Sequence, residues 1–153
     1  MRSSRTVADV IVYVDSSQLV RAYLPDEDGY LEANGLLMGE DALVTSTWTL
    51  VEVTSALARA ARGGRADLLG LLAVFENDTA VDGPVTLLRP DPAAVEARAT
   101  EIVRDHAIRS LDALHLAVAE LAAMPLASPE RCGFASSDKA QAEVAANLDF
   151  VLV

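Results

Sequence analysis

Four acidic residues, far apart along the chain, stand where they could act together on a metal ion. Asp15 and Asp138 each follow an apolar run, Asp112 lies in the first turn of a predicted helix, and Glu52 lies one to two turns inside another. Mg²⁺ prefers such oxygen ligands and keeps several waters, so a few carboxylates suffice, and Mn²⁺ accepts the same oxygens. A site of this kind would suit phosphodiester hydrolysis, with one or two ions activating a water and stabilising the leaving oxygen.

Each acid taken alone also has a purely structural explanation. Asp15 could assist the cap of the helix that follows it. Asp112 and Asp138 lie in first turns, where the helix dipole favours negative charge. Glu52 could close a capping box with Thr49. No single residue of the four therefore decides the question.

The four acids considered jointly favour a metal site. Asp15 ends a strand that reads as fully buried, and Glu52 and Asp112 lie beside apolar helix positions. Unpaired carboxylates at the edge of a core are costly, and clustered ones raise one another's pKa. The nearest basic residues, Arg109 and Lys139, are too few to pair all four. A hard divalent cation would resolve this conflict.

Strands and helices are predicted to alternate along the chain, which implies an α/β fold with a mostly parallel sheet flanked by helices. In such a sheet, ligands bind beyond the carboxyl ends of the strands, where the acids can converge. The predicted strands are 10–14, 42–45, 85–88, 133–135 and 150–153. The predicted helices are 16–24, 30–38, 47–62, 66–76, 92–106, one from 110 and one capped by Ser136 and Ser137 that ends near Asn147.

The helix that begins at residue 110 carries Asp112, so its orientation matters for the site. Its spacing predicts a buried face that ends in a loop with Pro125 and Pro129. The residues expected on that face are Leu111, Leu114, Val118 and Leu121. The loop 124–132 would then be long, which makes the placement of Asp138 the least constrained.

Length and composition fit one domain with an aliphatic core. The chain has 153 residues, 52% of them hydrophobic and 5% aromatic. We expect a single domain over 10–153 after a loose segment at 1–9. The longest clean apolar run, 71–75, is far short of the roughly 20 residues of a membrane span. We expect no signal peptide and a cytoplasmic protein.

Charge and cysteine content limit the possible activities. The net charge of −11 argues against broad, non-specific binding of nucleic acid. It does not exclude a nuclease, because metal ions would cancel local negative charge and a few arginines could hold phosphates. The single cysteine, Cys132, allows neither an internal disulfide nor a thiolate zinc site, and we expect a buried or loop thiol.

Four motifs, in order, resemble those of PIN domains. The opening motif corresponds to 12–17, Val-Tyr-Val-Asp-Ser-Ser, and the second to 51–53, Val-Glu-Val. The stretch 109–117, Arg-Ser-Leu-Asp-Ala-Leu-His-Leu-Ala, is the most specific and is similar to VapC-type toxins of bacterial toxin–antitoxin pairs. The final motif corresponds to 136–138, Ser-Ser-Asp, with Ser where Thr is common. The resemblance covers nearly the whole chain.

This resemblance implies a three-layer PIN-like fold and a Mg²⁺- or Mn²⁺-dependent ribonuclease. Asp15, Glu52 and Asp112 would be metal ligands, and Asp138 would bind the ion directly or through water. Ser17 would orient Asp15 or a water on the metal. The resemblance also implies an RNA substrate such as tRNA or ribosomal RNA, a homodimer, an inhibiting VapB-type antitoxin and a role in growth arrest.

Other residues near these motifs are ambiguous. Ser136, in the final motif, would support the site. Arg109 could bind phosphate or pair with an acid. His115 lies on the helix of Asp112, where we favour packing or hydrogen bonding over a catalytic role. We expect His106 at the surface and Trp48 in the core or an interface.

Two rival folds are disfavoured by the residues around Asp15. A phosphotransfer receiver usually has an acidic pair after the first strand, but Ser16 follows Asp15. A haloacid-dehalogenase-type phosphatase would have a second Asp where Ser17 stands. Two alternatives stay open: a catalytically silent module that binds a partner protein, and a nuclease that acts on DNA.

Overall fold

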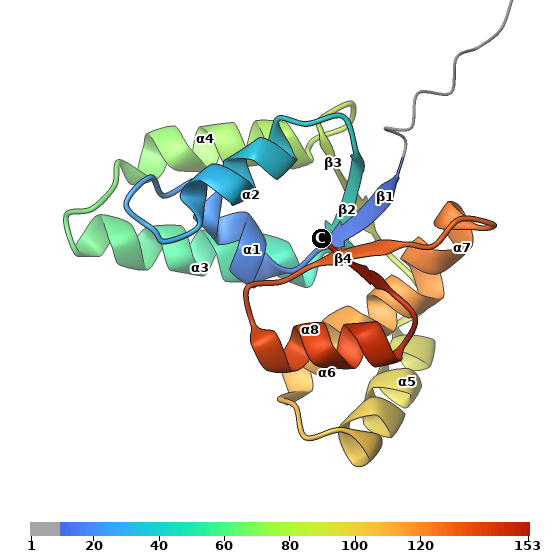
Figure 1. Ribbon diagram of the computed structural model, residues 1–153. Coiled ribbons are helices and arrows are strands. Elements are labelled where there is room, and N and C mark those ends of the chain that lie inside the picture. The colour runs from blue at the N-terminus through green and yellow to red at the C-terminus, as the bar shows by residue number, and fades with distance from the viewer. Residues whose placement is uncertain (1–9) are drawn as a thin grey trace, which may run out of the picture.

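A parallel sheet of five strands lies at the centre of the computed structural model, which describes residues 10–153 (Figure 1). The strand order is β3-β2-β1-β4-β5, and every pairing is parallel. The strands are β1 (Ile11–Val14), β2 (Ala42–Ser46), β3 (Val85–Leu88), β4 (Gly133–Ala135) and β5 (Val151–Leu152). The predicted α/β class with a parallel sheet is confirmed. The loose segment expected at 1–9 lies outside the described residues.

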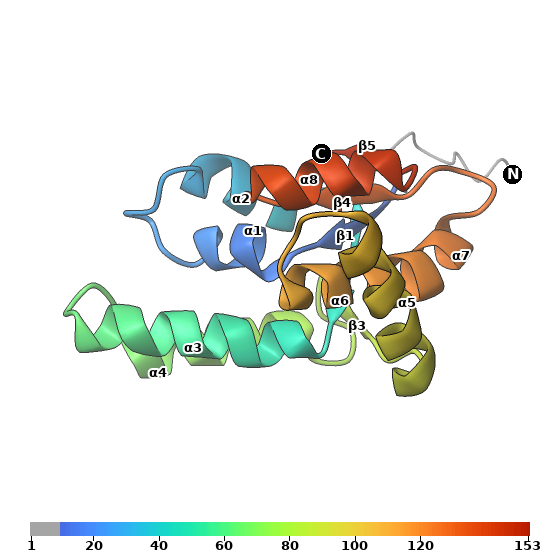
Figure 2. The same cartoon turned by 90° about the horizontal axis from the view of Figure 1, so that it is seen from below.

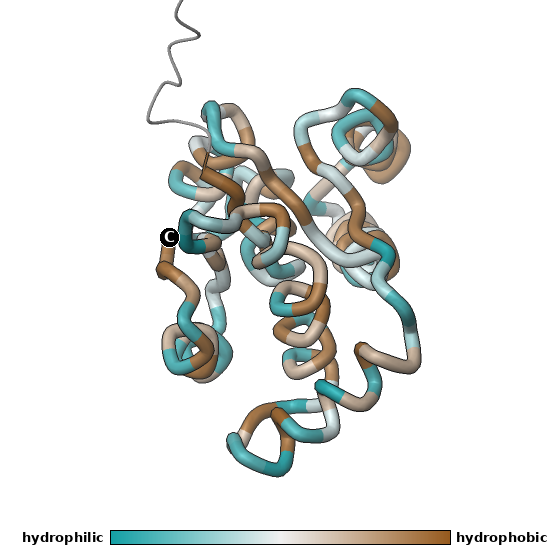
Figure 3. The backbone as a smooth tube through the Cα atoms, turned by 90° about the vertical axis from the view of Figure 1, so that its right-hand side faces the viewer, coloured by the Kyte–Doolittle hydropathy of each residue, from teal (hydrophilic) through white to brown (hydrophobic). Residues whose placement is uncertain are grey.

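Helices cover both faces of the sheet, which gives three layers (Figures 1 and 2). One face is covered by α1 (Ser16–Arg21), α2 (Tyr30–Leu37), α3 (Trp48–Arg62) and α4 (Leu68–Thr79). The other is covered by α5 (Pro92–Asp105), α6 (Ser110–Val118), the π-helical turn η1 (Ala119–Ala123), α7 (Met124–Ala127) and α8 (Lys139–Asn147). Hydrophobic and hydrophilic residues alternate along many of these helices, as expected for helices that cover a sheet (Figure 3).

The position of β1 at the centre of the sheet explains why its residues form an unbroken apolar run. Val12 and Val14 point into the core on the side of α1–α4, whereas Tyr13 points into the core on the side of α5–α8. All three are at most 1% exposed. Successive side chains of a strand point to opposite faces, so a strand between two helical layers must be apolar at every position. Asp15 follows at once and begins the site.

Several predicted boundaries and faces differ from the structure. The helix α1 ends at Arg21 rather than Leu24, although Ala22, Tyr23 and Leu24 are still buried. The helix α4 is displaced toward the C-terminus relative to the predicted 66–76, and Phe75 is its one buried residue. Propensity alone locates the ends of such short amphipathic helices poorly, because packing decides where they stop.

The helix of Asp112 is longer and differently oriented than predicted. Instead of entering a loop, the chain continues through η1 into α7, and Pro125, which has no N–H to donate to the helix, lies just after the wide turn η1. The expected buried residues Leu111 and Leu121 are exposed. The prediction is confirmed for Val118, which is buried, and Leu114 is half-buried against the core. The helix also buries Ala113, Leu116, Ala117, Ala119 and Ala123. It runs through the core, so small residues let the sheet and the neighbouring helices approach it closely.

The same helical run is apolar enough to cross a membrane by length and composition. Within residues 10–153, Ser110–Ala127 is the one helix that meets these two criteria. Its buried residues pack between the sheet and the outer helices, and His115 on it bonds to Tyr13 in β1 and to Glu52 in α3. We therefore interpret it as the central helix of the α/β fold.

Candidate active site

All four predicted acids line one cleft of about 700 Å³. Asp15 follows β1, Asp138 follows β4, Glu52 lies in the second turn of α3, and Asp112 lies in the first turn of α6. The strands β1 and β4 are neighbours and parallel, so their carboxyl ends bring Asp15 and Asp138 to the same edge of the sheet. The structure thus brings together residues that are up to 123 positions apart (138 − 15).

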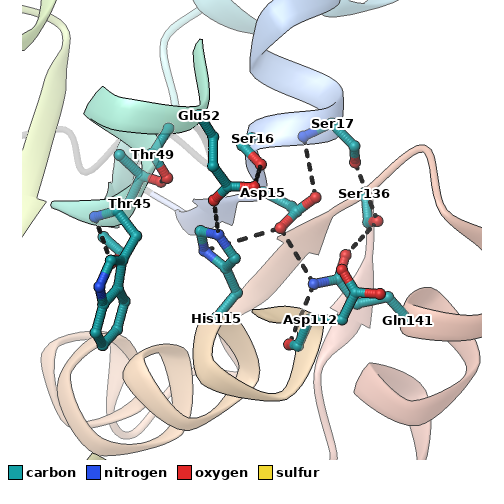
Figure 4. Close-up of polar contacts among 12 residues, drawn as sticks. Asp15, Ser16, Ser17, Thr45, Thr49, Glu52, Asp112, His115, Ser136 and Gln141 are labelled. Atoms are coloured by element: carbon teal, nitrogen blue, oxygen red, sulfur yellow. Dashed lines mark hydrogen bonds and ion pairs between the residues drawn. The ribbon is translucent and has the colours of Figure 1, made fainter. Parts of the chain in front are cut away.

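Asp15 is the most buried of the four acids, with 2% of its surface exposed. Its Oδ2 accepts a hydrogen bond from the backbone N–H of Ser17 at 3.0 Å, so Asp15 also caps α1. Its Oδ1 accepts a hydrogen bond from Gln141 Nε2 at 3.1 Å (Figure 4). Both oxygens are held by donors, and the carboxylate therefore has a fixed orientation.

Gln141 joins three parts of the site and was missed in the sequence. Its side chain is fully buried, and Nε2 donates both to Asp15 and to the backbone carbonyl of Asp112, the latter at 3.3 Å. Its Oε1 accepts from Ser136 Oγ at 2.6 Å. One sequence feature could have revealed it: Gln141 shares a helical face with the buried Val144 and Ala145, and a polar residue on a buried face needs partners.

Glu52 is held by a histidine and a serine. Ser16 Oγ donates to Glu52 Oε2 at 2.7 Å, and His115 Nε2 bonds to Glu52 Oε1. On its other side, His115 Nδ1 lies 2.7 Å from the hydroxyl of buried Tyr13 and 3.8 Å from Asp15 Oδ1. The hydrogen-bonding role expected for His115 is confirmed, and this histidine is a partner of Glu52 that the sequence reasoning did not count.

The capping box considered for Glu52 is absent. Thr49 instead shares a 2.7 Å hydrogen bond with Thr45, whose hydroxyl donates to the carbonyl of Val14. Glu52 is thus left to face Ser16 and His115. The sequence spacing was right for a box, but β2 supplies a nearer partner for Thr49.

Arg109 bridges the two remaining acids. Its Nε lies 3.2 Å from Asp112 Oδ2, and its Nη2 lies 3.0 Å from Asp138 Oδ2. In this structure Arg109 therefore pairs with acids. The salt bridges among residues 10–153 include none to Lys139, the other cation considered in the sequence.

The hydroxyls of Ser17 and Ser136 accept hydrogen bonds from backbone N–H groups near Asp138. Asp138 itself caps α8 by accepting from the backbone N–H of Gln141, so the predicted cap by Ser136 and Ser137 is wrong. Ser136 Oγ accepts from the backbone N–H of Asp138. Ser17 reaches Asp15 through its backbone N–H, while its hydroxyl accepts from the backbone N–H of Ser137 at 3.2 Å. The hydroxyl of Ser17 thus ties the Asp15 turn to the Asp138 turn.

Comparison with known proteins agrees with the motifs and the fold. The model of the PIN domain matches residues 12–147. The chain belongs to the PIN-domain family. Within it, ribonuclease VapC45 and ribonuclease VapC49 of Mycobacterium tuberculosis, strains CDC 1551 and H37Rv, are each 38% identical over 112 residues, which are 71% of this chain and 74% of each relative. This PIN domain is therefore a homologue of proteins named ribonuclease VapC.

A solved structure supports the fold. A chain in the crystal structure of VapBC2 from Rickettsia felis, bound to a DNA fragment from their promoter, superposes with a TM-score of 0.61. The alignment covers 94% of this chain and 98% of that chain, at 13% identity. At this identity the likeness concerns the arrangement of strands and helices.

The surroundings of Asp112 in this PIN domain disfavour its ionised form, first through burial and then through neighbouring acids. Burial raises the pKa of the Asp112 carboxyl, Arg109 opposes this, and the charges of Asp15 and Asp138 add to the rise, so that the pKa lies above its ordinary value. Burial also raises the pKa of Glu52, but its bonds to His115 and Ser16 outweigh burial and leave that pKa below its ordinary value. The Asp112 side of the cleft is thus where added positive charge would be most favourable.

The carboxylate oxygens of the PIN-domain cleft are ligands that suit a hard cation, but in this structure they are not arranged around a common point. Within residues 10–153, no three His, Cys, Asp or Glu side chains stand ready to hold an ion. The reason is visible in the contacts: Arg109 spans Asp112 and Asp138, and Glu52 is turned to Ser16 and His115. The oxygen set suits Mg²⁺ or Mn²⁺, provided that Arg109 and Glu52 rearrange.

Proposed function

We propose that this PIN domain is a Mg²⁺- or Mn²⁺-dependent endoribonuclease that cuts structured RNA, as the toxin of a type II toxin–antitoxin pair. The convergence of Asp15, Glu52, Asp112 and Asp138 on one cleft carries the proposal. The 38% identity to proteins named ribonuclease VapC supports RNA rather than DNA as the substrate. We propose tRNA or ribosomal RNA as the target.

Asp15, Glu52 and Asp112 would hold the cation, with Asp138 binding it directly or through water. A divalent ion bound there supplies an activated water and positive charge against the phosphodiester. Gln141 and the Ser17 N–H keep the Asp15 carboxylate aimed at the cleft. With Asp112 and Asp138 holding the cation, Arg109 would be free to bind a phosphate of the RNA, since its guanidinium is exposed.

The similarity to VapC proteins and to a VapBC structure also suggests protein partners for this chain. We propose a VapB-type antitoxin that binds and inhibits this chain, supported by the fold that it shares with a chain of the R. felis VapBC2 structure. We further propose that the active form is a homodimer in the cytoplasm. Release of the toxin from its antitoxin would then arrest growth.

Cleavage of a labelled total-RNA pool tests the proposal. The purified, antitoxin-free protein is assayed with Mg²⁺, with Mn²⁺ and with chelator, beside the variant Asp112→Asn. Asp105→Asn is a matched control, because Asp105 is exposed at the end of α5 and does not line the cleft. Isothermal titration with Mn²⁺ measures binding separately from activity.

Metal-dependent products that vanish in Asp112→Asn but persist in Asp105→Asn would support the nuclease. Cleavage that continues undiminished in chelator would contradict the metal requirement. A folded wild-type protein that neither binds Mn²⁺ nor cleaves any RNA would favour a silent module that binds a partner protein. Metal-dependent cutting of DNA alone would move the substrate class to DNA.

A further inference from the structure

The cleft that holds the four acids continues along α3 beyond Glu52. Five further α3 residues line it: Val51, Ser55, Ala56, Arg59 and Ala60. Glu52, Ser55, Ala56 and Arg59 are spaced i, i+3, i+4 and i+7, which places them on one face of the helix. At 1.5 Å of rise per residue, Arg59 lies about 10 Å along the helix from Glu52. The cleft therefore has an acidic end and a cationic end.

Three arginines line this cleft, and they differ in their partners. Arg65 is held by Asp26 at 2.7 Å and lies 3.6 Å from Glu27. Arg109 is held by two of the site acids. Arg59 has no carboxylate within ion-pair distance among residues 10–153, and it donates to Ser55 Oγ alone, at 3.2 Å.

Among the arginines of residues 10–153 that have no carboxylate partner, Arg59 is the one that lines the cleft. It keeps most of its five donors available on the wall of the cleft. On the α3 face of the cleft, the residues between Glu52 and Arg59 are Ser55 and Ala56, whose small side chains leave room for a ligand that spans both ends.

We propose that Arg59 binds a backbone phosphate of the RNA, next to but not at the bond that is cut. The proposal rests on the proposed nuclease function, which places the reacting phosphate at the acidic end of the cleft. Phosphates recur along a nucleic-acid strand at every nucleotide, about 3.4 Å apart along the axis of a duplex and farther apart when the strand is extended. A second phosphate one to three nucleotides away therefore falls at Arg59.

The chemistry of the two groups matches. A guanidinium is planar, always charged and able to donate two parallel hydrogen bonds to one phosphate. The hydroxyl of Ser55, which Arg59 already contacts, can donate to the same phosphate. An acidic protein segment would also suit Arg59, but it lacks the repeated phosphate needed to fill both ends of the cleft.

The test compares Arg59→Gln with Arg62→Gln on the full chain. Both substitutions remove one positive charge from the end of α3, but Arg62 does not line the cleft. Cleavage of labelled tRNA pool is measured with Mn²⁺ over a range of salt concentrations, and circular dichroism checks folding. We expect Arg59→Gln to raise KM about tenfold, which is the weight of one charge-assisted hydrogen bond. The slope of log affinity against log salt should fall by about 0.7, the contribution of one single-strand phosphate contact.

The outcomes separate the subsite from the nuclease itself. Equal KM and salt slope for Arg59→Gln and Arg62→Gln, in a wild-type protein that cleaves, would overturn the subsite and leave the nuclease standing. A lower kcat with unchanged KM would also overturn it, because a phosphate contact away from the cut bond acts on binding. Absence of cleavage by the wild type would overturn both proposals.

Discussion

The buried side chain of Gln141 offers the sharpest test of how the site is built. It donates to the Asp15 carboxylate at 3.1 Å and to the Asp112 carbonyl at 3.3 Å, and it accepts from Ser136 at 2.6 Å. The substitution Gln141→Met nearly conserves volume, so it leaves little cavity. The change therefore isolates the loss of these hydrogen bonds.

The expected loss of stability follows from the partners that are left behind. The hydrogen bond to a charged carboxylate is worth about 1.5–3 kcal/mol, and the one to the serine hydroxyl about 1 kcal/mol. The bond to the carbonyl is long, and we assign it little weight. We expect Gln141→Met to lower the free energy of unfolding by about 2–4 kcal/mol. For a chain of this size, that corresponds to a drop in Tm of roughly 6–12 °C.

Metal affinity is the second measurement, because a purely structural role would leave it unchanged. Groups that hold a metal ligand by hydrogen bonds typically contribute 10- to 100-fold to affinity. We therefore expect Gln141→Met to weaken Mn²⁺ binding by about tenfold or more in isothermal titration. Glu143→Met on the same helix is the control, since Glu143 is exposed and touches none of the site residues.

Two results would refute this reasoning. Equal unfolding free energies for Gln141→Met and Glu143→Met, within about 0.5 kcal/mol, would show that the buried hydrogen bonds contribute nothing measurable. A loss of stability with unchanged Mn²⁺ affinity would show that Gln141 holds the fold without orienting Asp15 toward a cation.

Two further substitutions test the core around the site by urea unfolding. His115→Leu leaves the buried hydroxyl of Tyr13 without its partner, and we expect a loss of about 2–4 kcal/mol, against less than about 0.5 kcal/mol for His106→Leu on the half-buried His106. Combining His115→Leu with Tyr13→Phe should be non-additive by at least about 0.5 kcal/mol; strict additivity would deny the bond. Gly133→Ala would bring a Cβ to 3.0 Å from Val12 in the core, and we expect a loss of about 1–3 kcal/mol, so a neutral effect would contradict the crowding.

The sequence by itself determined the strands and the acids. An unbroken apolar run that ends in Asp15 can be satisfied only by a strand buried on both faces, and β1 is such a strand. The repeated change from strand to helix implied a parallel sheet, whose carboxyl edge gathers residues that follow its strands. The order of the motifs around Asp15, Glu52, Asp112 and Asp138 indicated the family, because each motif is a short run of neighbouring residues that can be found in the sequence alone.

The course of the chain after Asp112 was decided by packing rather than by local pattern. Pro125 and Pro129 indicated a loop, but a π-helical turn shifts the helical phase and lets α7 continue the run. The shift moves Leu121, in η1, off the predicted face. Leu111 lies before η1, in the first turn of α6, where it faces solvent while Ala113 and Ala117 face the core. A regular helical period cannot predict a face across such a turn.

Only the tertiary structure decided which groups hold the acids. Gln141 and Asp15 are 126 residues apart, and His115 and Tyr13 are 102 apart. Gln141 meets Asp15 because β4, the fourth strand along the chain, pairs with the central β1 and leads α8 to the edge of the site. His115 meets Tyr13 because α6 packs against the face of the sheet to which Tyr13 points. Strand order is a property of the whole folded chain, since it depends on how all the helices cover the sheet. The acids could therefore be found from local sequence, whereas the contacts of Gln141 with Asp15 and of His115 with Glu52 could not.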